Sequence, residues 1–258
     1  TSFTRTAYLF SCTDHVEENL ETLLNFVQEP YFTEESVNKE KGIIGQEIRM
    51  YEDNPDWRVY FGLIRAMYKN HPVKLDIAGT VESINEITKD HLYTCYEAFY
   101  HPSNMLLFVV GNIDPEKIMQ KIRDNQSEKE FAKQRPIERF FPNEPEEVHQ
   151  SQNKIQLSVG IPKCYLGFKD KQSDYHGDDL LRREMSTHLL LDILFGQSSD
   201  LFQDLYERGI ISGPISTEFS IERHYAYSAI GTDTESPEEF EQRIRDFIKE
   251  KRRKGILE

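Results

Sequence analysis

The 258-residue chain has few cysteines and no long hydrophobic run. Its three cysteines, Cys12, Cys95 and Cys164, are odd in number and far apart. This gives no disulfide framework and favours a reducing, cytoplasmic location. The longest apolar run, residues 104–113, is much shorter than the roughly 18 residues that a membrane-spanning helix needs. We therefore expect a buried strand there and no membrane partner.

An excess of positive charge is also missing. The formal net charge is −14, whereas affinity for nucleic acids depends on Lys and Arg neutralising phosphates. We therefore expect no nucleic-acid partner, and we interpret the one basic cluster, residues 249–254, as a solvated helix end. The chain also has no initiator methionine and no signal peptide. We expect both of its ends to be cuts within a longer protein.

Apolar periodicity and capping residues predict mixed secondary structure. Helices are expected at about residues 16–27, 34–51, 57–69, 89–100, 179–195 and 200–207, and after Pro115 and Pro237; strands are expected at 7–12, 105–111, 155–161, 215–221 and 225–231. The charged, proline-containing stretch 125–152 has no sustained periodicity and indicates a linker.

The predicted fold is therefore α+β, with two related domains of antiparallel-rich sheets and packed helices, both truncated. We place the end of a first, catalytic-type domain at 1–124, the linker at 125–152 and the start of a second, non-catalytic domain at 153–258. A short internal repeat agrees with this division, because AYLFSCTD (7–14) returns as AYSAIGTD (226–233), offset by 219 positions. Four identities in eight residues are also within the reach of chance.

Two glutamates on one predicted helix are the first candidate site. Glu40 and Glu47 are seven residues apart, so they point almost the same way, beside an apolar stripe that runs from Val37 to Tyr51. A carboxylate half turned towards a core needs a positive partner, either a metal ion or a buried basic side chain. Two ordinary surface glutamates are the alternative, since the chain has 45 acidic residues. The spacing alone leaves these alternatives open.

A resemblance narrows the choice. Residues 35–58 contain E-x6-E in VNKEKGIIGQEIRMY, residues 100–105 contain Y-x-P-x-N-M, and residues 111–114 read G-x-I-D. These motifs, in this order, resemble the pitrilysin/insulinase zinc metallopeptidases, which include the mitochondrial processing peptidases, and especially their bacterial YmfH-type branch. The match runs over the whole chain, more loosely after Pro136.

The resemblance implies roles for particular residues. Glu47 matches the third zinc ligand, and Glu40 matches a glutamate that supports catalysis. The two histidine ligands and the glutamate base belong to H-x-x-E-H, which none of the eight histidines here completes. The family's spacing would put that motif about 30 residues before Thr1. Thr1 and Ser2 resemble the tail of the edge strand to which the substrate backbone is added.

The function implied for the parent protein is that of a zinc endopeptidase acting on peptides or unfolded segments, as a homodimer or as a heterodimer with a related paralogue. For this chain alone we expect neither hydrolysis nor tight zinc, because one carboxylate cannot complete the coordination. A non-catalytic scaffold subunit is the rival interpretation, and a plain peptide-binding module is a third. Glu184, His188 and Asp192, four apart on one helix, are interpreted as an exposed polar face.

Overall fold

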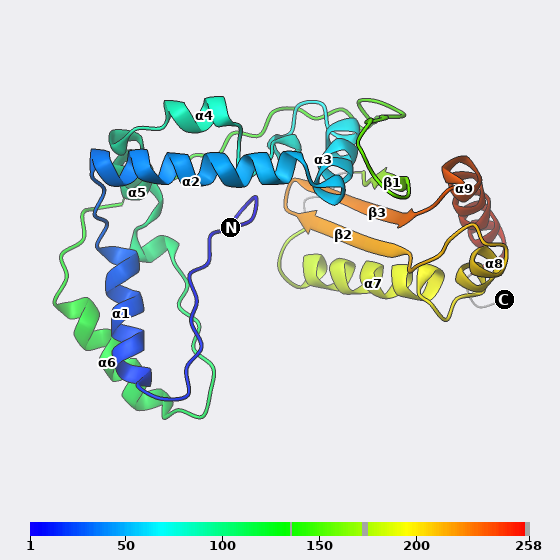
Figure 1. Ribbon diagram of the computed structural model, residues 1–258. Helices are drawn as coiled ribbons and strands as arrows, with labels where there is room; N and C mark the ends of the chain where they lie inside the picture. Colours follow the sequence, from blue (N-terminus) through cyan, green and yellow to red (C-terminus); the bar gives the residue numbers. More distant parts are fainter. Residues whose placement is uncertain (135, 172–174, 256–258) are drawn as a thin grey trace. The chain divides into compact units, whose positions relative to one another are not determined.

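The computed structural model describes residues 1–134, 136–171 and 175–255 (Figure 1). Its helices and strands, in chain order, are α1 (Val16–Gln28), α2 (Glu34–Glu52), α3 (Pro55–Met67), the 3-10 turn η1 (Pro72–Lys74), α4 (Val81–Glu86), α5 (Lys89–Phe99), the 3-10 turn η2 (Pro102–Asn104), α6 (Pro115–Ser127), β1 (Lys163–Lys169), α7 (Gly177–Phe195), α8 (Asp200–Glu207), β2 (Ser216–Glu222), β3 (Tyr225–Asp233) and α9 (Pro237–Lys254). Helices combined with an antiparallel sheet confirm the predicted α+β class.

The predicted helices are confirmed, and two of them begin with the expected side-chain caps. The Asn54 side chain accepts hydrogen bonds from the backbone N–H groups of Asp56 and Trp57, at 2.9 and 3.1 Å. Asp114 does the same for the first turn of α6, with Pro115 at the first helical position. A side-chain acceptor at this position satisfies amides that the helix itself cannot bond.

Three predicted strands are wrong. Residues 7–12, 105–111 and 155–161 are not strands in the structure. Their composition is right for strands, but a strand also needs a partner for its backbone groups, and no ladder among the described residues reaches these segments. Some of their apolar side chains are consequently bare, with Leu9 83% and Phe108 81% exposed.

The strands that do form make one three-stranded antiparallel sheet in the order β1-β3-β2. β3 is the central strand, and its register with β1 runs from Lys163 opposite Asp233 to Lys169 opposite Tyr227. β1 was missed from the sequence, which predicted a strand at 155–161 instead. One hydrophobic core joins this sheet to α7, α8 and α9, with Phe195, Leu205 and Phe240 almost completely buried.

The chain divides into two compact units. Unit 1 comprises Thr1–Glu47 and Ile77–Phe140, and its core lies where Leu20 and Leu24 of α1 meet Ile118 of α6. Unit 2 comprises Ile48–Asp76 and Phe141–Glu258 and contains α3, the sheet and the last three helices. These units do not follow the predicted boundaries at 124 and 153, and the division into two related domains stays a prediction.

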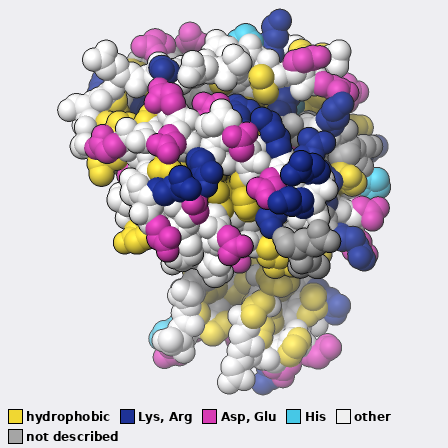
Figure 2. Space-filling view, turned by 90° about the vertical axis from the view of Figure 1, so that its right-hand side faces the viewer, with side chains coloured by type: hydrophobic (Ala, Val, Ile, Leu, Met, Phe, Trp, Pro, Cys, Tyr) yellow, Lys and Arg dark blue, Asp and Glu magenta, His cyan; other side chains and the backbone are white. Residues whose placement is uncertain are grey.

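The predicted linker, residues 125–152, begins within α6 and is irregular over the rest of its described length. One part of it is nevertheless firmly held, because Glu144 is almost buried and bonded to neighbouring backbone. Among the described residues, no helix is long and apolar enough to cross a membrane. Figure 2, which views the right-hand side of Figure 1, shows acidic and basic side chains intermixed on that face.

Candidate functional site

Helix α2 carries the two glutamates singled out from the sequence. The helix begins as predicted, after Thr33, whose hydroxyl accepts the Ser36 N–H at 3.0 Å while the Ser36 hydroxyl accepts the Thr33 N–H at 3.0 Å. This reciprocal capping fixes the first turn. The predicted apolar stripe is also present, with Val37 6% and Ile48 4% exposed.

Glu40 and Glu47 lie beside this stripe, and both side chains are exposed. The described residues therefore do not bury either carboxylate. Seven helical residues correspond to a rise of about 10 Å and a rotation of about 20°. The two carboxylates thus lie two turns apart on one side of α2, which suits one ligand and one supporting group better than two ligands of a single ion.

The described residues do not form a complete zinc site. A catalytic zinc ion takes three protein ligands and keeps a fourth position open. Among the described residues, no group of three His, Cys, Asp or Glu side chains is placed to hold a metal ion. Glu47 can supply one carboxylate donor, so no catalytic step is assigned to the residues of this chain.

The remaining sequence candidates are Thr1 and Ser2 at the start of the chain and the polar residues of α7. Thr1 is exposed, and Ser2 donates its backbone N–H to the Arg5 carbonyl at 2.8 Å, in a bend instead of a strand. The substrate-binding role of these two residues stays a prediction. On α7, His188 packs edge-on against Phe219, with ring centroids 6.0 Å apart.

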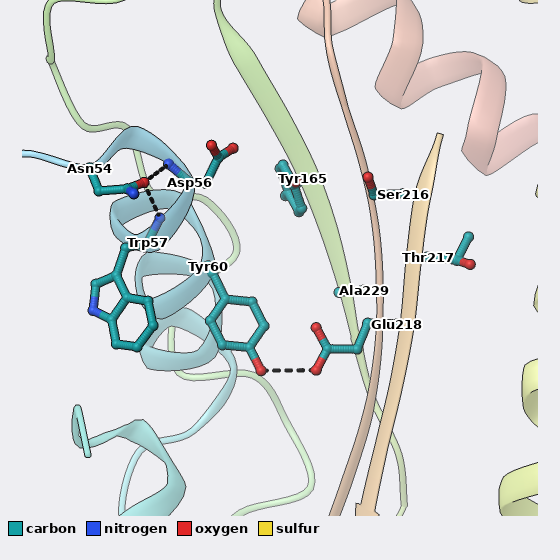
Figure 3. A pocket seen from close by; sticks show the side chains of 9 residues that line it. All are labelled: Asn54, Asp56, Trp57, Tyr60, Tyr165, Ser216, Thr217, Glu218 and Ala229. Carbon is teal, nitrogen blue, oxygen red and sulfur yellow. Dashed lines mark hydrogen bonds between the residues drawn. The ribbon is translucent and has the colours of Figure 1, made fainter. Parts of the chain in front are cut away.

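Unit 2 holds a polar cluster that the sequence did not reveal. The Tyr60 hydroxyl on α3 donates to the Glu218 carboxylate on β2 at 2.9 Å and lies 2.6 Å from the Tyr227 hydroxyl on β3 (Figure 3). The Tyr227 hydroxyl is also hydrogen-bonded to Glu218, so the three side chains form one network. Burial raises the pKa of Tyr227 to about 12 and raises the pKa of the Glu218 carboxyl. No local signal could have found partners that are 158 positions apart.

Two protein-family models match almost the whole chain. The family model described as "Insulinase (Peptidase family M16)" matches residues 1–81, and the one described as "Peptidase M16 inactive domain" matches residues 86–258. The chain belongs to peptidase family M16. This confirms the pitrilysin/insulinase resemblance. The first match contains helix α2, which carries Glu40 and Glu47, and the roles of these two residues stay predictions.

Several M16 relatives agree with this assignment. The chain is 55% identical over 248 residues to the "Uncharacterized zinc protease YmfH" of Bacillus subtilis, covering 96% of this chain and 58% of that protein. It is 28% identical over 120 residues to the "Probable inactive metalloprotease YmfF" of the same organism, covering 45% of this chain and 28% of that protein. The chain therefore spans a little over half of the length of its YmfH relative.

Solved structures agree with the fold. An M16-like peptidase from Alicyclobacillus acidocaldarius superposes with a TM-score of 0.91 at 39% identity, covering 95% of this chain and 57% of that one. A protease from Helicobacter pylori has a TM-score of 0.76 at 16% identity, covering 91% of this chain and 56% of that chain. At so low an identity, this second likeness supports the fold alone.

Proposed function

We propose that this chain is part of a zinc-dependent endopeptidase that cleaves peptides or unfolded segments, in which Glu47 supplies one zinc ligand and Glu40 supports it. The observation that carries the proposal is the pair of exposed carboxylates on one side of α2, in a chain 55% identical to a protein named as a zinc protease. The remaining ligands have to come from residues that this sequence does not contain, since it lacks H-x-x-E-H.

The rival function is that of a non-catalytic scaffold subunit. It is favoured by the match of residues 86–258 to a domain described as inactive, and by the likeness to a relative named as an inactive metalloprotease. It is disfavoured by the presence of both glutamates, because a scaffold has no need of metal-ligand spacing. We therefore prefer the endopeptidase.

Partners and location belong to the same proposal. We propose a peptide substrate, and a homodimer or a heterodimer with a related paralogue as the assembly. The cysteines are free, with Cys12 and Cys95 exposed, and exposed thiols persist best in a reducing compartment such as the cytoplasm. Size measurement in solution, with and without the co-expressed paralogue, would distinguish the two kinds of dimer.

The test uses the whole protein in which this chain occurs. Glu47→Gln is expected to lower chelator-sensitive cleavage of a fluorogenic peptide at least about 100-fold and to lower bound zinc, because a ligand is lost. Glu40→Gln is expected to lower cleavage about 10- to 100-fold while zinc stays bound, as for a group that supports a ligand. Cleavage rate and zinc content are measured on the same preparations.

Glu52→Gln is the matched control, because Glu52 is exposed on the same helix but about 140° around it from Glu47. It is expected to keep both activity and zinc. Full activity and full zinc content in Glu47→Gln would contradict the ligand assignment. Absence of chelator-sensitive cleavage from the wild-type protein, together with its capture by an active paralogue, would favour the scaffold.

A further inference from the structure

Unit 2 contains a cavity of about 320 Å³ between the first turns of α3 and the strands of the sheet (Figure 3). Trp57 and Tyr60 line it from α3, Tyr165 from β1, and Ser216 and Glu218 from β2. None of the residues proposed for the peptidase function lines this cavity. Its volume lies at the small end of the range for ligand pockets and suits a group about the size of one side chain.

Glu218 gives the cavity a negative charge without a matching cation. Its hydrogen-bond partners are the hydroxyls of Tyr60 and Tyr227, which are neutral groups. No ammonium or guanidinium of the described residues lies within ion-pairing distance of it. Burial raises the pKa of this carboxyl, while the hydrogen bonds from Tyr60 and Tyr227 and the nearby His188 act in the opposite direction. A cation entering the cavity would therefore be attracted to it.

Aromatic rings also line this cavity. Trp57 is held in place, because it stacks on Tyr51 with centroids 4.3 Å apart and planes 15° apart, and because its indole N–H donates to Asp76 at 2.6 Å. Tyr60 and Tyr165 add two further rings. Aromatic faces attract cations, and they also cover the apolar stem of a basic group.

The ammonium of Lys163, on β1, is already neutralised. Lys163 lies 2.8 Å from Asp56 and 2.8 Å from Asp233, so two carboxylates share its ammonium. Asp56, which also lines the cavity, is thereby occupied. Glu218 is left as the carboxylate on which an incoming cation would settle, while an anion would meet net negative charge.

We propose that this cavity binds an alkylguanidinium group, carried either by a free arginine-like cation or by an arginine side chain of a peptide. A planar guanidinium stacks on aromatic rings and can bond both oxygens of a carboxylate. An ammonium is compact and strongly hydrated and gains less from such walls. The assignment stands independently of the zinc chemistry, since every lining residue lies in unit 2.

The chain offers a built-in reporter for the test, because Trp57 is its single tryptophan. Ethylguanidinium and N-acetyl-arginine amide are titrated separately into the protein while Trp57 emission is followed. Saturable binding of either compound is expected, and the tighter of the two identifies the source of the group. N-ethylurea, a neutral compound of the same shape, is expected to cause no saturable change.

Glu218→Gln keeps the shape of the side chain but removes its charge, and is expected to weaken binding about tenfold or more. Asp53→Asn is the matched control, because Asp53 is exposed and lies outside the cavity lining, and it is expected to leave binding unchanged. Equal responses to N-ethylurea and ethylguanidinium in the wild-type protein would overturn the proposal without requiring any variant to fold. Equal affinities of Glu218→Gln and Asp53→Asn would also overturn it, provided that their circular dichroism matches the wild type.

Discussion

Lys169 of β1 and Glu144 form an ion pair at 2.7 Å, with the two side chains only 5% and 10% exposed. The same carboxylate accepts the backbone N–H groups of Lys69, Asn70 and His71, at 2.6 to 2.8 Å. Glu144 therefore ties the segment that follows α3 to the edge of the sheet. A buried carboxylate is stable only while its counter-charge and its hydrogen-bond donors are all present.

Replacing Glu144 is expected to destabilise unit 2 strongly. Glu144→Gln leaves the Lys169 ammonium buried without its counter-charge, and removing one partner of a buried pair costs about 3 kcal/mol or more. Urea unfolding followed by Trp57 fluorescence measures the change. Glu146→Gln is the matched control, because its pair with Lys171 at 3.0 Å is largely exposed, with side chains 68% and 83% accessible. Its cost is expected to stay below about 1 kcal/mol, and equal costs for the two variants would contradict the role of burial.

The same pair predicts a dependence of stability on pH. Burial opposes the charge of Glu144, but the Lys169 ammonium and the three amides outweigh burial and lower the pKa of this carboxyl from 4.5 to about 2. A lowered folded-state pKa gives stability that is present above the unfolded-state value and is lost as the pH falls towards the folded-state value. The difference in unfolding free energy between wild type and Glu144→Gln should therefore shrink between pH 4.5 and about 2. A difference that stays constant over this window would contradict the assignment.

Replacing two glycines by alanine is expected to change the free energy of unfolding in opposite directions. A Cβ at Gly231 in β3 would collide with the ring of Tyr165, so Gly231→Ala should cost about 1 to 3 kcal/mol. A Cβ at Gly42 in α2 would meet no atom within 4 Å. Gly42→Ala should therefore stabilise α2 by about 0.5 to 1 kcal/mol, because alanine has less backbone freedom to lose. Thermal unfolding followed by circular dichroism compares the two, and a shift of the same sign in both would refute the argument.

The sequence predicted the helices well and the strands poorly, and the reason is physical. A helix start such as Asn54-Pro55 or Asp114-Pro115 is recognised by its own residues, because capping acts within one turn. A strand depends on a partner elsewhere in the chain. Residues 105–111 have the composition of a buried strand but no ladder, whereas KCYLGFK of β1 has a weak pattern and pairs over its whole length. The glycine within β1, Gly167, lies where Met67 and Leu63 of α3 press closely on the strand.

For the candidate sites too, the sequence revealed residues that lie on one helix but not partners that are distant in the chain. Glu40 and Glu47 were found because one helix presents both, and a family motif gave their spacing a meaning. Tyr60 and Glu218 are joined only by the folded chain, and each alone is an unremarkable residue. Glu144 lay in a stretch that was interpreted as a linker, because an irregular backbone bonded through side chains has no periodicity to detect.

The helix cap at Asp114 gives a local test in unit 1. Its carboxylate accepts the N–H groups of Glu116 and Lys117 at 3.0 and 3.4 Å, and it also lies favourably at the positive end of the helix dipole. Asp114→Ala should therefore cost about 1 kcal/mol, and hydrogen exchange of these two amides should become faster. Asp114→Asn keeps an acceptor at the same position and is expected to preserve most of the protection. Ile118 of the same helix packs on Leu20 and Leu24 of α1. Fast amide exchange in the first turn of Asp114→Ala would show that this turn frays. Slow exchange from Ile118 onwards would show that packing still holds the rest of α6. Unchanged protection in Asp114→Ala would mean that packing, and not the cap, fixes the start of this helix.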